Sequence, residues 1–190
     1  AGLPAVPVAM NLSAASLLDA GLPAAVEAQL RRNQVPPALL ELEITESAAM
    51  HDLGRARDTV DALREVGVRI ALDDLGTGYS SLSHLRDLRA DRLKIDRSFV
   101  ASGDRFGNAI AAAIGVLGRS LGLGVVAEGI ETPDQLAFCR EQRIAKAQGW
   151  LFHRPAVRWP EGPHPSLRPD PAGAPSDPVH PESPPDNAPV

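Results

Sequence analysis

The amino-acid sequence predicts an α/β protein built around a parallel sheet. Short apolar runs alternate with longer segments in which apolar residues recur every three or four positions, the pattern of repeated strand–helix units. Polar side chains follow the carboxyl end of each apolar run, which is where the active sites of βα barrels are built. The two observations together favour a sheet with a chemical site along one edge.

Strands are expected where a short apolar run is bounded by turn residues. A weak candidate lies around residues 149–152, before the chain becomes rich in proline. The five clear candidates are residues 6–10, 39–44, 69–72, 92–95 and 124–127.

Helices are expected between these strands. Apolar residues at helical spacing mark the segment from Leu53 to Val66, which Gly67 ends, and the segment from Phe106 to Leu121, which Gly122 ends. A third helix opens with Thr132-Pro133-Asp134-Gln135, a capping box with proline at its first helical position. We interpret the apolar periodicities as core packing without a chemical role.

Composition limits the class of protein. The formal net charge is −5 and no run of lysine or arginine occurs, so no binding to DNA or RNA duplexes is expected. Cys139 is the only cysteine, which excludes an intrachain disulfide and favours a reducing, cytoplasmic compartment. The apolar stretch Ala109–Ile114 is far shorter than the roughly 20 residues that span a bilayer, although a longer parent protein could still be tethered to a membrane.

The carboxyl-terminal part of the chain differs from the rest. From residue 155 onward the sequence holds 12 of the 18 prolines and few large apolar side chains. Such a segment cannot bury enough surface to offset its ordering entropy. We therefore expect residues 1–156 to form one domain and residues 157–190 to be a disordered tail.

The most informative stretch runs from Arg69 to Ser81. Asp73 and Asp74 lie side by side at the end of a buried apolar run, and a glycine-rich turn follows at once. Adjacent carboxylates repel each other, so a cation is expected to offset their charge. The alternative is a solvated Asp-Asp turn that caps a helix beginning near Ser80, a frequent use of so short a motif.

Polar residues near the ends of all six candidate strands make that alternative weaker. The set is rich in carboxylates and contains neither histidine nor cysteine, and hard oxygen ligands of this kind select Mg²⁺ or Mn²⁺. Two such ions would support in-line displacement at phosphorus, with the lysine beside the phosphate or the attacking water. The residues alone therefore predict metal-dependent phosphodiester hydrolysis. They are Asn11, Glu43, Glu46, Asp73, Asp74, Lys94, Asp96, Glu128, Glu131 and Gln148.

Six segments then identify a family. In their residues, order and spacing they resemble EAL domains, bacterial phosphodiesterases that linearise the second messenger cyclic di-GMP. The resemblance covers roughly residues 4–155 and implies a (β/α)₈ TIM-type barrel. The segments are Asn11-Leu12-Ser13, Glu41-Leu-Glu43-Ile-Thr-Glu46-Ser47, Asp73-Asp74-Leu-Gly-Thr-Gly-Tyr-Ser-Ser81, Leu93-Lys94-Ile-Asp96-Arg-Ser-Phe99, Val126-Ala-Glu128-Gly-Ile-Glu131-Thr132 and Gln148-Gly-Trp-Leu-Phe152.

The resemblance assigns metal ligands. Asn11, Glu43, Asp73, Asp74 and Glu128 fall where the family binds two Mg²⁺ or Mn²⁺ ions, and Glu128 is also favoured there as a proton acceptor. The resemblance further implies a homodimer, with GGDEF or sensory domains fused upstream.

It also assigns supporting roles. Lys94 matches the lysine that orients the nucleophilic water, and Gln148 matches the glutamine that supports it. Glu46 matches a glutamate that holds the loop after the paired aspartates, and Glu131 matches a further carboxylate of the site. Asp96 matches another residue of the family's site, and a purely structural role at the end of the strand is an equal alternative for it.

The chain departs from the family in two respects. Leu75 replaces the phenylalanine usual after the two aspartates, for which we expect a modest effect on loop packing. The Glu-Ala-Leu motif, on the second strand of the family, does not occur in the 190 residues. We therefore expect an incomplete barrel with about six of eight βα units.

Three functions are compatible with such a chain. It is part of an active phosphodiesterase, a sensor that binds cyclic di-GMP without cleaving it, or an inactive remnant. Every catalytic position that the chain covers carries the expected residue type, which disfavours the sensor.

Overall fold

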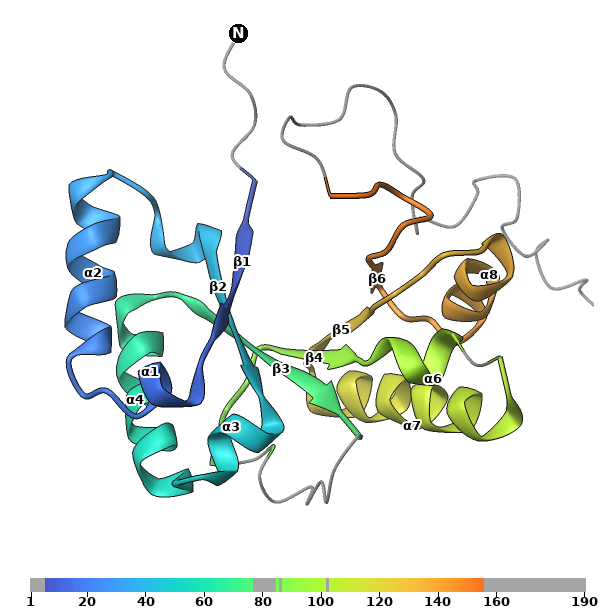
Figure 1. Ribbon diagram of the computed structural model, residues 1–190, viewed down its shortest axis with the longest axis horizontal. Helices are drawn as coiled ribbons and strands as arrows, with labels where there is room; N and C mark the ends of the chain where they lie inside the picture. The colour runs from blue at the N-terminus through green and yellow to red at the C-terminus, as the bar shows by residue number, and fades with distance from the viewer. Residues whose placement is uncertain (1–5, 77–84, 86, 102, 156–190) are drawn as a thin grey trace, which may run out of the picture.

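The computed structural model describes residues 6–76, 85, 87–101 and 103–155. Six strands form one sheet in the order β1-β2-β3-β4-β5-β6, and every neighbouring pair is parallel. Figure 1 shows them as a curved sheet with β1 and β6 at its two ends. The predicted parallel half-barrel is thus confirmed. The strands are β1 (Val8–Leu12), β2 (Leu40–Thr45), β3 (Arg69–Leu75), β4 (Arg92–Ile95), β5 (Gly124–Ala127) and β6 (Lys146–Ala147).

Helices connect the strands and cover the sheet. Figure 1 shows α2 and α4 beside the first strands, with α7 and α8 beside the last ones. Among the described helices, none is long and apolar enough to cross a membrane. The helices are α1 (Ala14–Leu17), α2 (Leu22–Arg32), α3 (Glu46–Met50), α4 (Leu53–Val66), α6 (Arg97–Ala101), α7 (Arg105–Leu121) and α8 (Pro133–Glu141), with a 3₁₀ turn at Pro37–Leu39.

The predicted helix boundaries are confirmed by their caps. Gly67 and Gly122 end α4 and α7 with φ of 98° and 70°, the left-handed conformation that glycine adopts without steric cost. Asp104 accepts a hydrogen bond from the Gly107 N–H at the start of α7. The capping box predicted at Thr132 is present, with Gln135 as its partner.

Two sequence expectations differ from the structure. The sixth strand is Lys146–Ala147 and not residues 149–152. Gly149 turns the chain, and the Leu151 N–H then donates to the Ile130 carbonyl at 2.9 Å in a loop contact. Helix α7 is correctly placed, but Phe106 and Leu121, at its two ends, are exposed and not part of the core.

The core lies between the sheet and its helices. Ile44, Ile70, Leu72, Leu93 and Ile95 are fully or almost fully buried on the strands, where they pack against apolar faces of the helices. Strand β1 is different, because its residues are mostly exposed and it pairs with β2 on one side only within the described chain. The helix expected near Ser80 and the tail from residue 157 onward lie outside the described residues.

Substitution of two glycines of α7 tests how tightly this helix packs on the sheet. A Cβ at Gly118 would lie 2.2 Å from Val125 Cγ2 on β5, whereas a Cβ at Gly115 would meet its neighbours at ordinary contact distances of 3.5 Å or more. We expect Gly118→Ala to destabilise the fold by about 1–3 kcal/mol through overpacking. Gly115→Ala should instead be neutral or stabilise by up to about 1 kcal/mol through helix propensity. Urea unfolding of both variants measures the difference, and equal effects would contradict the packing argument.

Candidate active site

A buried lysine gathers three carboxylates at the carboxyl ends of the strands. Lys94 Nζ on β4 lies 2.6 Å from Glu43 Oε2 on β2, 3.0 Å from Asp73 Oδ2 on β3 and 2.7 Å from Glu128 Oε1 after β5. We call these four residues the lysine cluster. Parallel strands bring their carboxyl ends to one edge, so residues far apart in the sequence meet there.

Burial and charge shift the pKa values of Lys94 and Glu128. Lys94 is only 3% exposed. Burial alone would lower the pKa of Lys94, but hydrogen bonds to Glu128, Glu43 and Asp73 outweigh it and raise the pKa above its usual value. Burial raises the pKa of Glu128, and the negative charges of Asp73 and Glu43 add to this effect while Lys94 opposes it. With three carboxylates and one ammonium, the cluster has more negative than positive groups.

Asp74 adds a further carboxylate beside the cluster. Its φ of 58° is a left-handed value that non-glycine residues seldom adopt, and its N–H donates to Asp73 Oδ1 at 2.9 Å. Burial and the charges of Asp73 and Asp96 raise the pKa of Asp74. Such strain and repulsion persist only where the surrounding structure imposes them, and they concentrate at functional sites.

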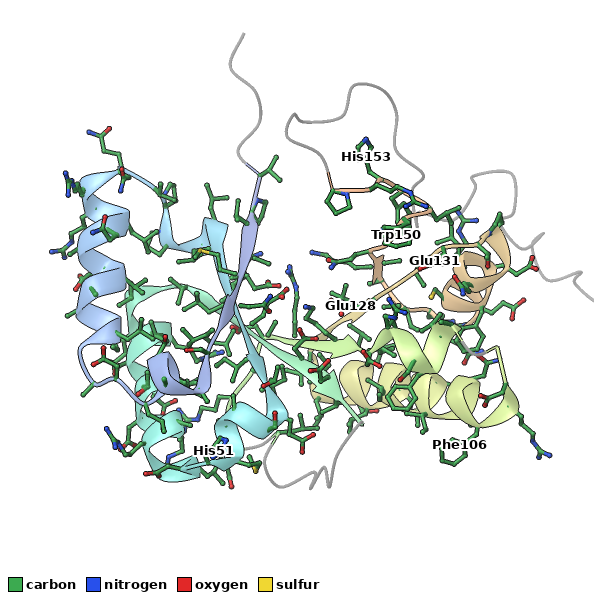
Figure 2. All side chains as sticks on the ribbon, viewed as in Figure 1. His51, Phe106, Glu128, Glu131, Trp150 and His153 are labelled. Carbon is green, nitrogen blue, oxygen red and sulfur yellow. The ribbon has the colours of Figure 1, made fainter. Side chains whose placement is uncertain are left out.

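The loops after β5 and β6 form a second side of the site. Gln148 Nε2 donates to Glu128 Oε1 over a long 3.4 Å, and the Ile130 N–H donates to the Gln148 carbonyl at 3.1 Å. Glu128, Glu131 and Gln148 line a cavity of about 450 Å³ together with Trp150 and Arg154. Figure 2 shows Glu128, Glu131 and Trp150 in the same part of the molecule, well away from His51.

The remaining predicted residues lie at the same edge with different surroundings. Asn11 on β1 is in register with Glu43, and its side chain is exposed. Glu46 is buried in the first turn of α3. Asp96 Oδ1 accepts hydrogen bonds from the Ser98 N–H and hydroxyl at the start of α6, which supports its reading as a structural partner, although Asp96 also lines the cavity.

Sequence reasoning missed two features of this region. Arg154 stacks on Trp150, with its guanidinium carbon 4.3 Å from the ring centre, and both side chains line the cavity. Below the lysine cluster, Arg92 pairs with the buried Glu41. Trp150 belongs to the segment Gln148–Phe152 that resembles the family, but the sequence indicated no role for its side chain. The Glu41–Arg92 pair depends on the register of the strands, which the sequence does not display.

The donor atoms of the site fit a hard divalent cation by their chemistry. Glu43, Asp73, Asp74 and Glu128 bring carboxylates against the single charge of Lys94, an excess that Mg²⁺ or Mn²⁺ would offset. Within the described ranges, no group of three or more histidine, cysteine, aspartate or glutamate side chains is arranged to hold a metal ion. Three of these carboxylates instead contact the Lys94 ammonium.

Comparison with known proteins identifies related sequences. The profile of the EAL domain family matches residues 1–155. The cyclic di-GMP phosphodiesterase NbdA of Pseudomonas aeruginosa is 45% identical over 150 residues, which are 78% of this chain and 19% of NbdA. The chain spans about a fifth of the length of the curated relatives it matches.

Solved structures share the fold. The phosphodiesterase of P. aeruginosa MucR in complex with c-di-GMP has a TM-score of 0.75 at 44% identity, over 78% of this chain and 61% of that one. A manganese and cyclic di-GMP complex of Klebsiella pneumoniae BlrP1 has a TM-score of 0.74 at 30% identity, over 80% of this chain and 39% of that one. A calcium complex of BlrP1 with the same nucleotide gives 0.72 at 32% identity, over 78% and 39%.

Removing the Lys94 ammonium should expose the repulsion among the carboxylates. We expect Lys94→Met to destabilise the metal-free fold at pH 7 by about 3–5 kcal/mol, because buried charges lose their partner. A carboxyl whose pKa is higher folded than unfolded contributes less stability as pH rises above its unfolded value. The loss of stability in Lys94→Met should therefore shrink as the pH falls towards 4.5, the ordinary pKa of a glutamate such as Glu128.

Urea unfolding at a series of pH values from about 5 to about 8 measures this pH dependence of the stability loss. Arg57→Met, at an exposed cation on α4, is the control and should change stability by less than about 0.5 kcal/mol. A Lys94→Met loss that stays constant with pH would contradict the carboxylate repulsion.

Proposed function

The chain belongs to the EAL domain family, and from this premise we propose that its site takes part in hydrolysing cyclic di-GMP to the linear dinucleotide. The observation that carries the proposal is the lysine cluster, in which carboxylates from β2, β3 and the end of β5 converge on one buried ammonium. Relatives of known structure, including MucR, are complexes with the same nucleotide.

The metal ligands proposed are Asn11, Glu43, Asp73, Asp74 and Glu128. Their oxygen atoms suit Mg²⁺ or Mn²⁺, and BlrP1 has been solved as a manganese complex. Two bound ions would supply charge stabilisation and a lowered water pKa for in-line displacement at phosphorus. Binding them requires that the Lys94 ammonium release some of the carboxylates that it now contacts.

Each side chain of the site would then have a separate role in the hydrolysis. Lys94 orients the attacking water, and Gln148 supports that water and Glu128. Glu128, whose pKa is raised chiefly by burial, accepts the proton from the water as its oxygen attacks phosphorus. The bond from phosphorus to the ribose oxygen breaks on the opposite side, and that oxygen takes a proton from solvent water to become the free hydroxyl. Glu46, Glu131 and Asp96 are proposed to support the loops of the site.

The wider context is also proposed. The curated relatives are longer, and one of them is named as a bifunctional diguanylate cyclase and phosphodiesterase. We therefore propose that the domain works in the cytoplasm as part of a bacterial signalling protein with a cyclase or sensory domain. A homodimer through this domain follows from the family resemblance.

Hydrolysis by the gene product that contains this chain tests the function. With Mg²⁺ or Mn²⁺ we expect conversion of cyclic di-GMP to the linear dinucleotide, measured by chromatography. Lys94→Ala should lower kcat by about 10²–10³-fold, because its interaction is made in the transition state. Asp73→Asn should abolish turnover. Glu65→Gln, on the exposed face of α4, should leave activity unchanged.

The 190-residue chain alone should be inactive, because its six described strands do not close the eight-stranded barrel that supports such sites. Tight nucleotide binding without turnover by the gene product, in either metal, would favour the sensor function instead.

Calcium should separate binding from catalysis. Ca²⁺ is larger than Mg²⁺, accepts more flexible coordination and activates bound water less. We expect the gene product to bind cyclic di-GMP with Ca²⁺ but to turn it over at least about tenfold more slowly than with Mn²⁺, a loss of about 1.4 kcal/mol in transition-state stabilisation. Isothermal calorimetry measures the binding and chromatography the turnover. Equal rates with both ions would contradict the proposed role of the metal.

A further inference from the structure

A second ion pair lies next to the lysine cluster, towards the amino ends of the same strands. Arg92 on β4 pairs through Nη1 with Glu41 Oε2 on β2, and the exposed fractions of the two side chains are 16% and 7%. Arg92 precedes Lys94 by two residues, and Glu41 precedes Glu43 by two residues. Alternate residues of a strand face the same side of a sheet, so both pairs lie on the same face.

The Arg92–Glu41 and Lys94–Glu43 pairs both join β4 to β2, at successive positions along the strands. Strand β3 lies between β2 and β4, so each cation of β4 reaches across β3 to a glutamate of β2. On β3, Ala71 is fully buried and in register with Arg92, whereas Arg69 is in register with Glu41. The methyl group of Ala71 leaves room for the longer side chains to meet.

The stem of Arg92 is also confined from the other side. Gly124 on β5 is in register with Arg92, and a Cβ at Gly124 would lie 3.0 Å from Arg92 Cγ. The backbone of Gly124 therefore confines the aliphatic stem of Arg92, while Ala71 leaves space for the guanidinium to reach Glu41. Arg69 on β3 is in register with Glu41, and the charges of Arg92, Glu41 and Arg69 all act on the pKa of Lys146, so Glu41 lies in a locally basic layer.

We propose that the Glu41–Arg92 pair positions the lysine cluster, by fixing β4 against β2 at the level just before Lys94 and Glu43. Among the ion pairs of the described residues, Glu41 and Arg92 pair with each other and not with the lysine cluster, so both are positioning residues and not catalytic ones. The inference concerns the geometry of the cluster; only its effect on turnover rests on the proposed function.

The direct test observes the Lys94 ammonium. A buried, ion-paired ammonium exchanges its protons slowly, and its ¹H–¹⁵N NMR signal in the 190-residue chain is assigned by its loss in Lys94→Met. We expect Arg92→Met to shift or broaden this signal beyond detection, and Arg92→Lys to restore a signal close to that of the wild type.

A matched control separates positioning from general stability. Arg64 on α4 forms another ion pair, 2.7 Å from Asp91, whose side chains are about one-third exposed. Arg64→Met should lower stability in urea unfolding but leave the Lys94 signal unchanged. An unchanged signal in folded Arg92→Met, or equal perturbation by Arg64→Met, would overturn the proposal.

Two further measurements decide the remaining cases. If Arg92→Met does not fold, Glu41→Asp, which keeps the charge but shortens the side chain, should shift the Lys94 signal, and an unchanged signal overturns the proposal. In the gene product, Arg92→Met or Glu41→Asp should lower kcat by about 10²-fold with little change in KM, as expected for a small misplacement of a catalytic group. If the wild type proves inactive, the proposed function fails while the NMR result still decides the positioning.

Discussion

The structure depends on one buried ammonium. Lys94 holds Glu43, Asp73 and Glu128 within 2.6–3.0 Å, and each of these carboxylates comes from a different segment of the chain. A buried charge without partners is strongly destabilising, so the ammonium is stable only where the strands end at matching levels. The parallel order of the strands meets this condition, because it delivers their carboxyl ends to one edge.

The same requirement explains the irregular end of β3. The register between β3 and β4 shifts between Leu72 and Leu75, and Asp74 takes a left-handed φ within this interval. The shift lets Asp73 face Lys94 while Asp74 remains nearby, at the cost of an unusual backbone conformation. Local rules of strand geometry are broken where the charged side chains must be placed, as is common at functional sites.

The sequence predicted most of the fold because its signals are local. Gly67, Gly122 and the Thr132 capping box end or begin helices through their own backbone chemistry, and five strands followed from apolar runs. The sixth strand was misplaced because Gly149 turns a segment that reads as apolar, and Phe106 is exposed although it follows the helical period. The lysine cluster was expected from strand ends, whereas the Glu41–Arg92 pair required a register that only the structure supplies.

The balance of charge changes along the strands. In the lysine cluster and Asp74, four carboxylates meet the single positive charge of Lys94, and the pKa values of Glu128 and Asp74 are both raised. Towards the amino ends of the strands, Glu41 pairs with Arg92, is in register with Arg69 and acts on the pKa of Lys146. Three basic side chains there accompany one carboxylate, so the sign of the excess is reversed. A basic layer beneath an acidic one attracts cations to the open edge and not to the interior of the sheet. The arrangement of charge along the strands therefore favours divalent cations at the edge where the proposed chemistry takes place.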